Sequence, residues 1–344
     1  MGSSSSESTC FCSSFASSSS SSSTSINISS SSSESNAEES LMFPSKTQFL
    51  QTYRHQSFSL PESIMHYMAM NPPSAEIYEK LVKSCKYFFV KNPILILSDL
   101  HFKFNEWGTL FKCFEGPYRY KWTKVDVASH KFWITQSLYV DPRYPNFDSD
   151  GKPVGDSNNK YRLIATVIPR IYQCNAKKLT MFNQVMFYNE LLVLAPSVEY
   201  IDFSDVFCVY ENDDGLVSFE KLFVLFPKVK SIRMNVIPGT SLITSTTFKA
   251  LLEMPHFLNL DFLELRGVPE SFDIESFYIY MKTNKHAKIY LCFSDTLSDG
   301  YKARLEAIVD EILEAKNRDY KTPLLYFPGI EDGKRKKLRK MYNR

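Results

Sequence analysis

Glycine is scarce in this sequence, with only 11 among 344 residues. Loops that cradle phosphate groups need glycine, because their backbone adopts positive φ angles and approaches the ligand closely. Neither a G-x-x-x-x-G-K-[ST] run nor a G-x-G-x-x-G run is present. The sequence therefore predicts no nucleotide-binding loop of either kind.

Long apolar runs are also absent, and no stretch reaches the roughly 18–20 residues that a membrane-spanning helix needs. The seven cysteines are odd in number and mostly isolated. That pattern is typical of thiols in a reducing compartment, not of a disulfide framework or a zinc site. We therefore expect an intracellular protein, cytoplasmic and/or nuclear, without a metal or another cofactor.

Catalytic motifs are missing, with one partial exception. There is no G-x-S-x-G nucleophile elbow and no H-E-x-x-H metal motif. The apolar run from Pro93 ends in Asp99-x-His101, which resembles the first metal-binding strand of metallophosphoesterases. Two-metal chemistry needs several further carboxylate, Asn and His ligands, and their motifs are absent. We expect no catalytic activity, and a metal-dependent phosphoesterase using Asp99 and His101 is a remote alternative.

Charge is unevenly distributed behind a net charge of +2. Residues 1–40 carry four acidic and no basic residues, and residues 334–344 carry seven basic and no acidic residues. The body between them is nearly neutral, which is not typical of a nucleic-acid-binding protein. We expect protein partners for it, and no nucleic acid.

The first 40 residues include 22 serines, and such a segment cannot bury enough apolar surface to fold. We predict a disordered tail over residues 1–42. Its start matches the M-G-x-x-x-[ST] pattern of N-myristoylation at Gly2, with Cys10 and Cys12 as candidate palmitoylation sites. Two lipids would hold the protein on a membrane, so a membrane partner is expected only if this tail is acylated.

Residues 331–344 form a basic tail by sequence. Its run Lys334-Arg335-Lys336-Lys337 has the composition of a nuclear-import signal. The alternative is a charged tail that is kept soluble by its own charge.

Residues 55–92 are predicted to form two short amphipathic helices. The first follows Leu60, with Pro61 in its first turn and an apolar stripe that includes Ile64 and Met65. Asn71-Pro72-Pro73 ends it, and Ser74 is a suitable N-cap for the second. The apolar residues of the second helix share one face at helical spacing: Ile77, Leu81, Cys85 and Phe88.

This segment resembles the F-box in its opening Leu60-Pro61-x-Ser63-Ile64 and its closing Leu81-Val82-x-x-Cys85-Lys86-x-Phe88. An F-box binds a Skp-type adaptor, which links it to a cullin–RING ubiquitin ligase. The resemblance implies that seven residues contact that adaptor, namely Leu60, Pro61, Ile64, Met65, Ile77, Leu81 and Phe88. The alternative is a helical hairpin that packs on its own protein.

Residues 93–176 are predicted to be a strand-rich linking segment. Three runs are rich in aromatic and β-branched residues, at 94–100, 131–140 and 161–168. A polar loop at 141–159 separates the last two. The sequence indicates no function for this segment.

Residues 177–330 contain a repeat. Four segments share a φ-x-x-φ-x-φ pattern, starting at Val198, Val229, Leu260 and Lys288, with spacings of 31, 31 and 28 residues. A predicted helix precedes each one, and Pro196, Pro227 and Pro255 recur between helix and strand. This period is similar to that of leucine-rich repeats, and a doubly wound α/β domain is the alternative.

The resemblance to leucine-rich repeats implies an irregular α/β solenoid in which the φ residues form the core. A helix at 301–317 and the segment 324–330 would cap it. The residues between the φ positions would face the concave side and bind a substrate: Tyr200, Asp202, Ser231, Arg233, Phe262, Glu264 and Tyr290.

An F-box-like hairpin followed by leucine-rich repeats is the arrangement of substrate receptors of SCF-type ubiquitin ligases. We therefore predict a non-catalytic adaptor that links a Skp-type adaptor and a cullin ligase to a protein substrate. The alternative is a repeat-containing protein-binding protein with no ligase link.

Overall fold

The computed structural model describes residues 47, 51, 53–54, 57–112, 120–128, 130–143, 146–147, 153–154, 161–211, 215–237, 240, 242–315 and 319–344. The chain divides into two compact units, residues 1–40 and 41–344, and every described residue lies in the second. The predictions made for the serine-rich tail, including Gly2, Cys10 and Cys12, lie outside the described residues.

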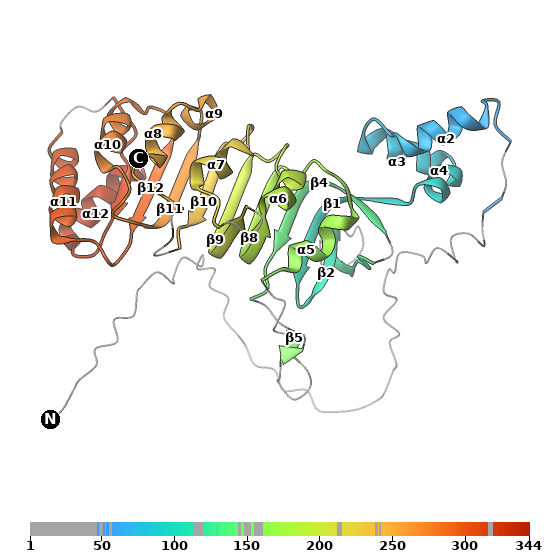
Figure 1. The fold of residues 1–344 in the computed structure, drawn as a ribbon, viewed down its shortest axis with the longest axis horizontal. Coiled ribbons are helices and arrows are strands. Elements are labelled where there is room, and N and C mark those ends of the chain that lie inside the picture. The colour runs from blue at the N-terminus through green and yellow to red at the C-terminus, as the bar shows by residue number, and fades with distance from the viewer. Residues whose placement is uncertain are drawn as a thin grey trace, which may run out of the picture. The chain divides into compact units, whose positions relative to one another are not determined.

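The second unit is mixed α/β, which confirms the predicted class (Figure 1). Its helices are α2 (Glu62–Met70), α3 (Ala75–Ser84), α4 (Lys86–Lys91), α5 (Leu163–Val167), the 3-10 helix η2 (Ile168–Arg170), α6 (Tyr188–Leu194), α7 (Phe219–Val224), α8 (Thr247–Leu252), α9 (Pro255–Leu258), α10 (Ile274–Thr283), α11 (Asp299–Glu314) and α12 (Asp332–Tyr342). Its strands are β1 (Ile94–Lys103), β2 (Glu106–Lys112), β3 (Tyr120–Lys124), β4 (Lys131–Val140), β5 (Asn146–Phe147), β6 (Pro153–Val154), β7 (Ile171–Cys174), β8 (Lys178–Phe187), β9 (Tyr200–Tyr210), β10 (Ser231–Asn235), β11 (Phe262–Val268), β12 (Lys288–Phe293) and β13 (Leu324–Tyr326).

One eleven-stranded sheet has the order β13-β12-β11-β10-β9-β8-β4-β1-β2-β3, with β7 paired to β4 off this path. Pairing is parallel from β1 through β4 to β13, and antiparallel only between β1, β2 and β3. The parallel strands on this path follow the order of the chain. A doubly wound domain reverses its strand order, so this order argues against that alternative.

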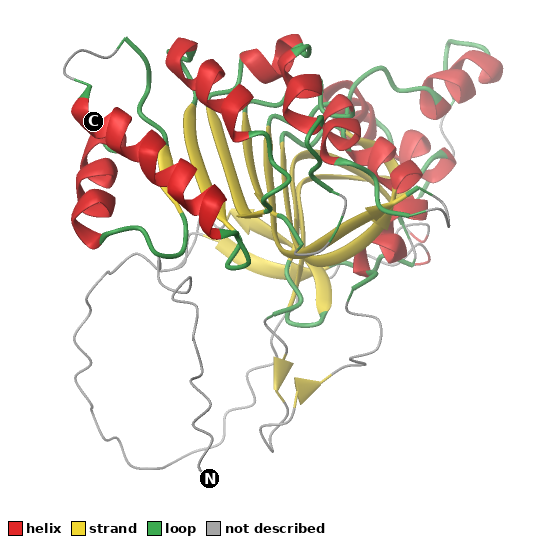
Figure 2. Ribbon diagram, turned by 60° about the vertical axis from the view of Figure 1, so that its left-hand side comes forward, coloured by secondary structure: helices red, strands yellow, loops and turns green. Residues whose placement is uncertain are grey.

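The helices between the repeat strands lie along one face of the sheet (Figures 1 and 2). The helices predicted before the four repeat strands are present as α6, α7, α8 and α10. Among the described residues, the opposite face of β8 to β12 carries no helix that connects two of these strands, and we call it the open face.

The predicted repeat strands pair in register over three copies. Tyr200 pairs with Ser231 and Ser231 pairs with Phe262, at the predicted spacing of 31 residues. The fourth copy was aligned wrongly, because Phe262 pairs with Lys288 and Leu265 pairs with Leu291. Its spacing is therefore 26 residues, not 28. The connection before β12 is shorter than the pattern of apolar residues suggested.

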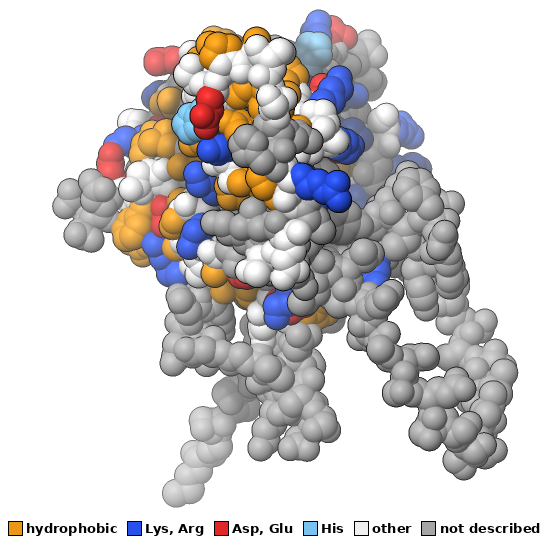
Figure 3. Space-filling view, turned by 90° about the vertical axis from the view of Figure 1, so that its right-hand side faces the viewer, with side chains coloured by type: hydrophobic (Ala, Val, Ile, Leu, Met, Phe, Trp, Pro, Cys, Tyr) orange, Lys and Arg blue, Asp and Glu red, His pale blue; other side chains and the backbone are white. Residues whose placement is uncertain are grey.

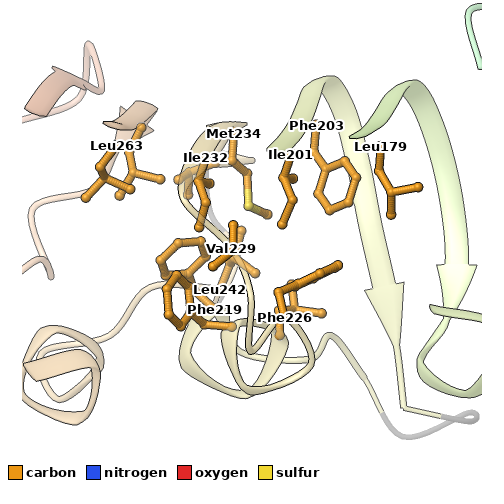
Figure 4. Close-up of a cluster of buried hydrophobic side chains, with 14 of the residues drawn as sticks. Leu179, Ile201, Phe203, Phe219, Phe226, Val229, Ile232, Met234, Leu242 and Leu263 are labelled. Atoms are coloured by element: carbon orange, nitrogen blue, oxygen red, sulfur yellow. The ribbon is translucent and has the colours of Figure 1, made fainter. Parts of the chain in front are cut away.

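Alternate strand residues and the helices form the main core (Figure 4). Ile201 and Phe203 of β9 and Ile232 of β10 point toward Phe219 and Phe226, which belong to α7 and the turn after it. All five side chains are buried. The core continues without a break from Leu97 to Leu338, so residues 93–176 share it with the repeat strands.

Two predicted elements differ from the structure. Residues 161–168 were expected to be a strand, but Leu163–Val167 form helix α5. Ile164 and Val167 stand three residues apart and are both fully buried, which is the spacing of a helix face. The second helix of the hairpin was expected to be continuous, but it breaks at Cys85, where the backbone is extended. The Cys85 thiol accepts a hydrogen bond from the Tyr87 backbone N–H over 3.3 Å and so caps α4.

Helices α2, α3 and α4 contain a small core of their own. It consists of Met65, Ala69, Cys85, Tyr87 and Phe88. A separate cluster of Tyr78, Ile94 and Trp133 joins α3 to strands β1 and β4. The hairpin is therefore packed internally and also attached to the sheet.

Candidate functional site

Helix α2 presents an apolar stripe that its own core does not use. Ile64 and Tyr67 stand three residues apart on α2, and Leu60 lies just before the helix; the three side chains are 47%, 67% and 49% exposed. We call these three residues the hairpin patch. Figure 3 faces the end of the molecule that carries α2 to α4 and shows hydrophobic side chains gathered in its upper part, with charged side chains of both signs around them. An exposed apolar stripe of this kind is typical of a protein-binding helix.

The seven predicted adaptor-binding residues divide into two groups. Leu60, Pro61, Ile64 and Ile77 are exposed, and Ile77 stands on α3. Met65 and Phe88 are buried in the hairpin core, and Leu81 packs against it half-buried. The second group therefore maintains the hairpin, and in this conformation only the first group is available to a partner.

Tyr78 ties the hairpin to the sheet. Its hydroxyl donates to the Asn92 carbonyl and accepts from the Ile94 backbone N–H over 3.3 Å. The Asn92 side-chain amide donates to the Ala69 carbonyl over 3.1 Å. Burial raises the pKa of Tyr78 to about 12, so this hydroxyl keeps its proton at physiological pH and remains a donor.

The residues predicted to face the concave side all come from the open face. Tyr200, Ser231 and Phe262 form one cross-strand row, with Lys178 of β8 before them and Lys288 of β12 after them. Asp202, Arg233, Glu264 and Tyr290 form the next row. We call the first row the aromatic row and the second the ionic row.

The ionic row is a connected set of charge-assisted hydrogen bonds. Arg233 donates from Nη1 to Asp202 Oδ2 over 3.1 Å and from Nε to Glu264 Oε2 over 2.8 Å. Arg266 donates from Nε to the other oxygen of Glu264 over 2.7 Å. The Glu264 carboxylate is nearly buried, and two guanidinium groups compensate its charge.

Charges in the ionic row shift the pKa of their neighbours. Burial opposes the charged forms of Arg233 and Arg266, but hydrogen bonds to Glu264 outweigh it and raise the pKa of both guanidinium groups. Burial and the nearby Cys292 raise the pKa of Tyr290. Together with Arg266, the row therefore balances two carboxylates with two guanidinium groups.

A hollow of about 370 Å³ lies over the two rows. Its lining includes five predicted residues, namely Tyr200, Asp202, Ser231, Arg233 and Phe262, and two others, Lys178 and Ile201. Glu264 and Tyr290 do not line it. Mixed polar and aromatic walls around a hollow are typical of a recognition site.

Asp99 and His101 lie on β1, at the far end of the same sheet face. Ser137 donates its hydroxyl to Asp99, and the His101 ring packs between Trp122 and Tyr139. Burial lowers the pKa of His101, which favours its neutral form. Within the described ranges, no three His, Cys, Asp or Glu side chains come together as a metal site would require.

The basic C-terminal segment is a helix, α12, where the sequence had suggested a charged tail. Lys334 forms ion pairs with Glu306 and Asp310 of α11, over 2.8 and 2.7 Å. Leu338 is fully buried in the main core. Of the four residues predicted as an import signal, Arg335 pairs with Asp332 of the same helix, and Lys336 and Lys337 are exposed.

Three residues of these surfaces were not predicted. Tyr67 continues the stripe of Leu60 and Ile64, and its helical spacing was visible in the sequence. Lys178 and Lys288 join the aromatic row through strand register. The pattern Ala176-x-x-Leu179-x-Met181 was visible in the sequence and matches the observed register of Lys178 with Tyr200.

Neither a family model nor a curated protein nor a solved structure matches this chain. None of the helices in the described part of the chain has the length and apolar character needed to cross a bilayer.

Proposed function

We propose that this chain is a non-catalytic adaptor of the F-box type, in which α2 to α4 bind a Skp-type adaptor and the repeat region binds a protein substrate. The observation that carries the proposal is the hairpin patch. Leu60 and Ile64 are predicted contact residues, and Tyr67 lies next to them. About half or more of each side chain is exposed to solvent. Apolar side chains left out of a core in this way favour a partner that covers them.

The repeat region supports the substrate-binding half of the proposal. We propose that it is an irregular solenoid resembling leucine-rich repeats, and the pairing of strands β8 to β13 in chain order supports this. The backbone junctions also repeat. Lys177, Glu199 and Lys230 each accept hydrogen bonds from the two backbone N–H groups that begin the next unit. Each unit therefore contacts mainly its neighbours, as in solenoids.

The adaptor half is tested by capture of purified Skp-type adaptor and cullin on the immobilised full-length chain. Wild type should retain both. A Leu60→Asp, Ile64→Asp double variant places two unpaired charges in the contact. Burying them costs more than about 1.4 kcal/mol, the free energy that corresponds to a factor of ten in affinity. Retention should therefore fall by more than about tenfold.

The control variant is Ile279→Asp. Ile279 is an aliphatic residue that is 69% exposed on α10, and it lies far along the chain from the hairpin patch. It should leave retention unchanged. Folded wild type that retains no adaptor would refute the ligase link and leave the alternative of a protein-binding repeat protein.

The phosphoesterase alternative is tested separately by metal analysis of purified protein. One or two tightly held divalent ions per chain, lost in an Asp99→Asn variant, would favour that alternative. We expect no stoichiometric metal, because Asp99 accepts a hydrogen bond from Ser137 and His101 is packed between aromatic rings.

A further inference from the structure

The aromatic row has a symmetrical order of side chains across five strands. From β8 to β12 it runs Lys178, Tyr200, Ser231, Phe262, Lys288, each pairing with the next. The two rings therefore stand on either side of a serine, and each ring has a lysine beyond it.

The serine makes a slot between the two rings. Adjacent strands lie about 4.8 Å apart, so the backbones that carry Tyr200 and Phe262 are about 10 Å apart. A flat side chain placed over Ser231 would lie about 5 Å from each ring, within the range of aromatic pairs. The slot belongs to the hollow described above, whose walls include both rings and Ser231.

The charged side chains around the slot favour a bound segment that has acidic residues near its aromatic residue. Arg233 and Arg266 are occupied by Asp202 and Glu264. Lys178 and Lys288 are both exposed, and neither forms an ion pair with a carboxylate in the described ranges. The Lys288 ammonium lies 5.7 Å from the centre of the Tyr342 ring, so an aromatic face is its neighbour. The unpaired charges of the row are therefore positive and lie at its two ends.

The distance from the slot to each lysine matches the repeat of a peptide in the polyproline II conformation. Each lysine stands two strands from Ser231, at about 10 Å. A polyproline II peptide advances about 9.3 Å in a turn of three residues and returns its side chains to the same side. An aromatic residue in the slot would thus place residues three before and three after it over Lys178 and Lys288.

We propose that the open face binds a substrate segment of the form acid-x-x-aromatic-x-x-acid, laid across the strands in the polyproline II conformation. This rests on the substrate-binding half of the proposed function and names the class of substrate. A single-stranded nucleic acid also offers flat rings and negative charge. The peptide fits better, because the row offers one unpaired positive charge at each end, whereas a nucleic acid carries a phosphate at every nucleotide.

The test is fluorescence anisotropy with the full-length chain and a labelled Glu-Pro-Pro-Trp-Pro-Pro-Glu peptide. Three comparison probes are the same peptide with Lys for Glu, the same peptide with Ser for Trp, and Glu-Pro-Trp-Pro-Glu, in which the acids are one residue closer. We expect binding of the first peptide only, with affinity decreasing as salt rises.

The variants locate the site. Tyr200→Ala should weaken binding about tenfold, because it removes one wall of the slot. Ser231→Leu should abolish binding by filling the slot while both rings stay in place. Tyr161→Ala removes a tyrosine that is 41% exposed on another part of the chain, and it should change nothing.

Three outcomes would overturn the inference: equal binding of all four peptides, tighter binding of an oligothymidine than of the first peptide, or full binding by the Ser231→Leu variant. Adaptor capture by the same preparations separates this inference from the ligase proposal. Capture without peptide binding refutes the peptide motif alone, and peptide binding without capture refutes the ligase link alone.

Discussion

The hydroxyl of Tyr78 lies 3.3 Å from the backbone nitrogen of Ile94, the first residue of β1. It also donates to the carbonyl of Asn92. One side chain of α3 therefore joins the helical hairpin to the start of the sheet. In the proposed function the adaptor binds the hairpin and the substrate binds the sheet. The hydrogen bonds of Tyr78 would then hold the two binding regions together.

Replacing Tyr78 with Phe should lower the free energy of unfolding by about 1 kcal/mol, the usual net value of one hydrogen bond. The loss is small because the Asn92 carbonyl keeps a second hydrogen bond, from the Ile94 N–H over 2.9 Å. Urea denaturation measures the change. Tyr67→Phe is the control, since Tyr67 is 67% exposed, and it should leave the midpoint unchanged.

Glu264→Gln should lower the free energy of unfolding by about 2 kcal/mol, because it weakens hydrogen bonds between charged groups at a nearly buried site. The matched control is Glu211→Gln. Glu211 pairs with Lys221 where both side chains are 48% exposed, and such pairs contribute about 0–1 kcal/mol. Equal effects of the two variants would contradict the structural role given to the ionic row.

Gly267→Ala should destabilise the sheet. Gly267 has a φ of 73° at the bulge between β11 and β12, and a Cβ there would lie 2.6 Å from the Val236 carbonyl oxygen. We expect a loss of at least about 1 kcal/mol from the strained backbone alone. Gly300→Ala, inside α11 with open space around it, should instead raise the thermal midpoint slightly. A thermal melt of both variants checks the contrast.

The pH dependence of stability should include a contribution from Asp141. Burial opposes its charged form, but hydrogen bonds from Arg143 and Tyr139 outweigh burial and lower the pKa of this carboxyl from 3.8. A lowered pKa stabilises the fold above the unfolded value, and that stability is lost as pH falls through the folded value.

The free energy of unfolding should therefore fall more steeply below about pH 4 in wild type than in Asp141→Asn. Denaturant titrations at a series of pH values measure the two slopes. Asp299→Asn, at a fully exposed position, is the control and should keep the wild-type slope. Identical slopes for wild type and Asp141→Asn would show that Asp141 makes no such contribution.

The repeat strands were predictable where period and residue type agreed. Ile201, Ile232 and Leu263 follow each other at a constant 31 residues, so one alignment placed all three. At β12 the alignment failed, because Lys288 begins the strand and the alternating apolar residues Ile289, Leu291 and Phe293 fit either of two registers. The period of the apolar residues alone therefore does not determine how many residues connect two repeat strands.

The candidate sites were predictable only in part. Exposed positions of β9 to β11 follow from strand alternation, which is why Tyr200 and Phe262 were placed on the correct face. The ion pairs of Arg233 depend on its alignment with both Asp202 and Glu264, a relation between residues 31 positions apart. The strand expected at 161–168 was wrong because Ile and Val also form buried helix faces.

The sheet ends at β13, a strand of only three residues between Pro323 and Pro328. Each unit of the sheet is placed relative to the one before it in nearly the same way. A second molecule that paired with a long exposed edge strand would therefore extend the sheet, and it would leave a new edge exposed. Such growth produces filaments. Proline on both sides of β13 limits that edge, and α12 packs against the strand. We therefore expect removal of α12 to expose this edge and to allow molecules to associate through it.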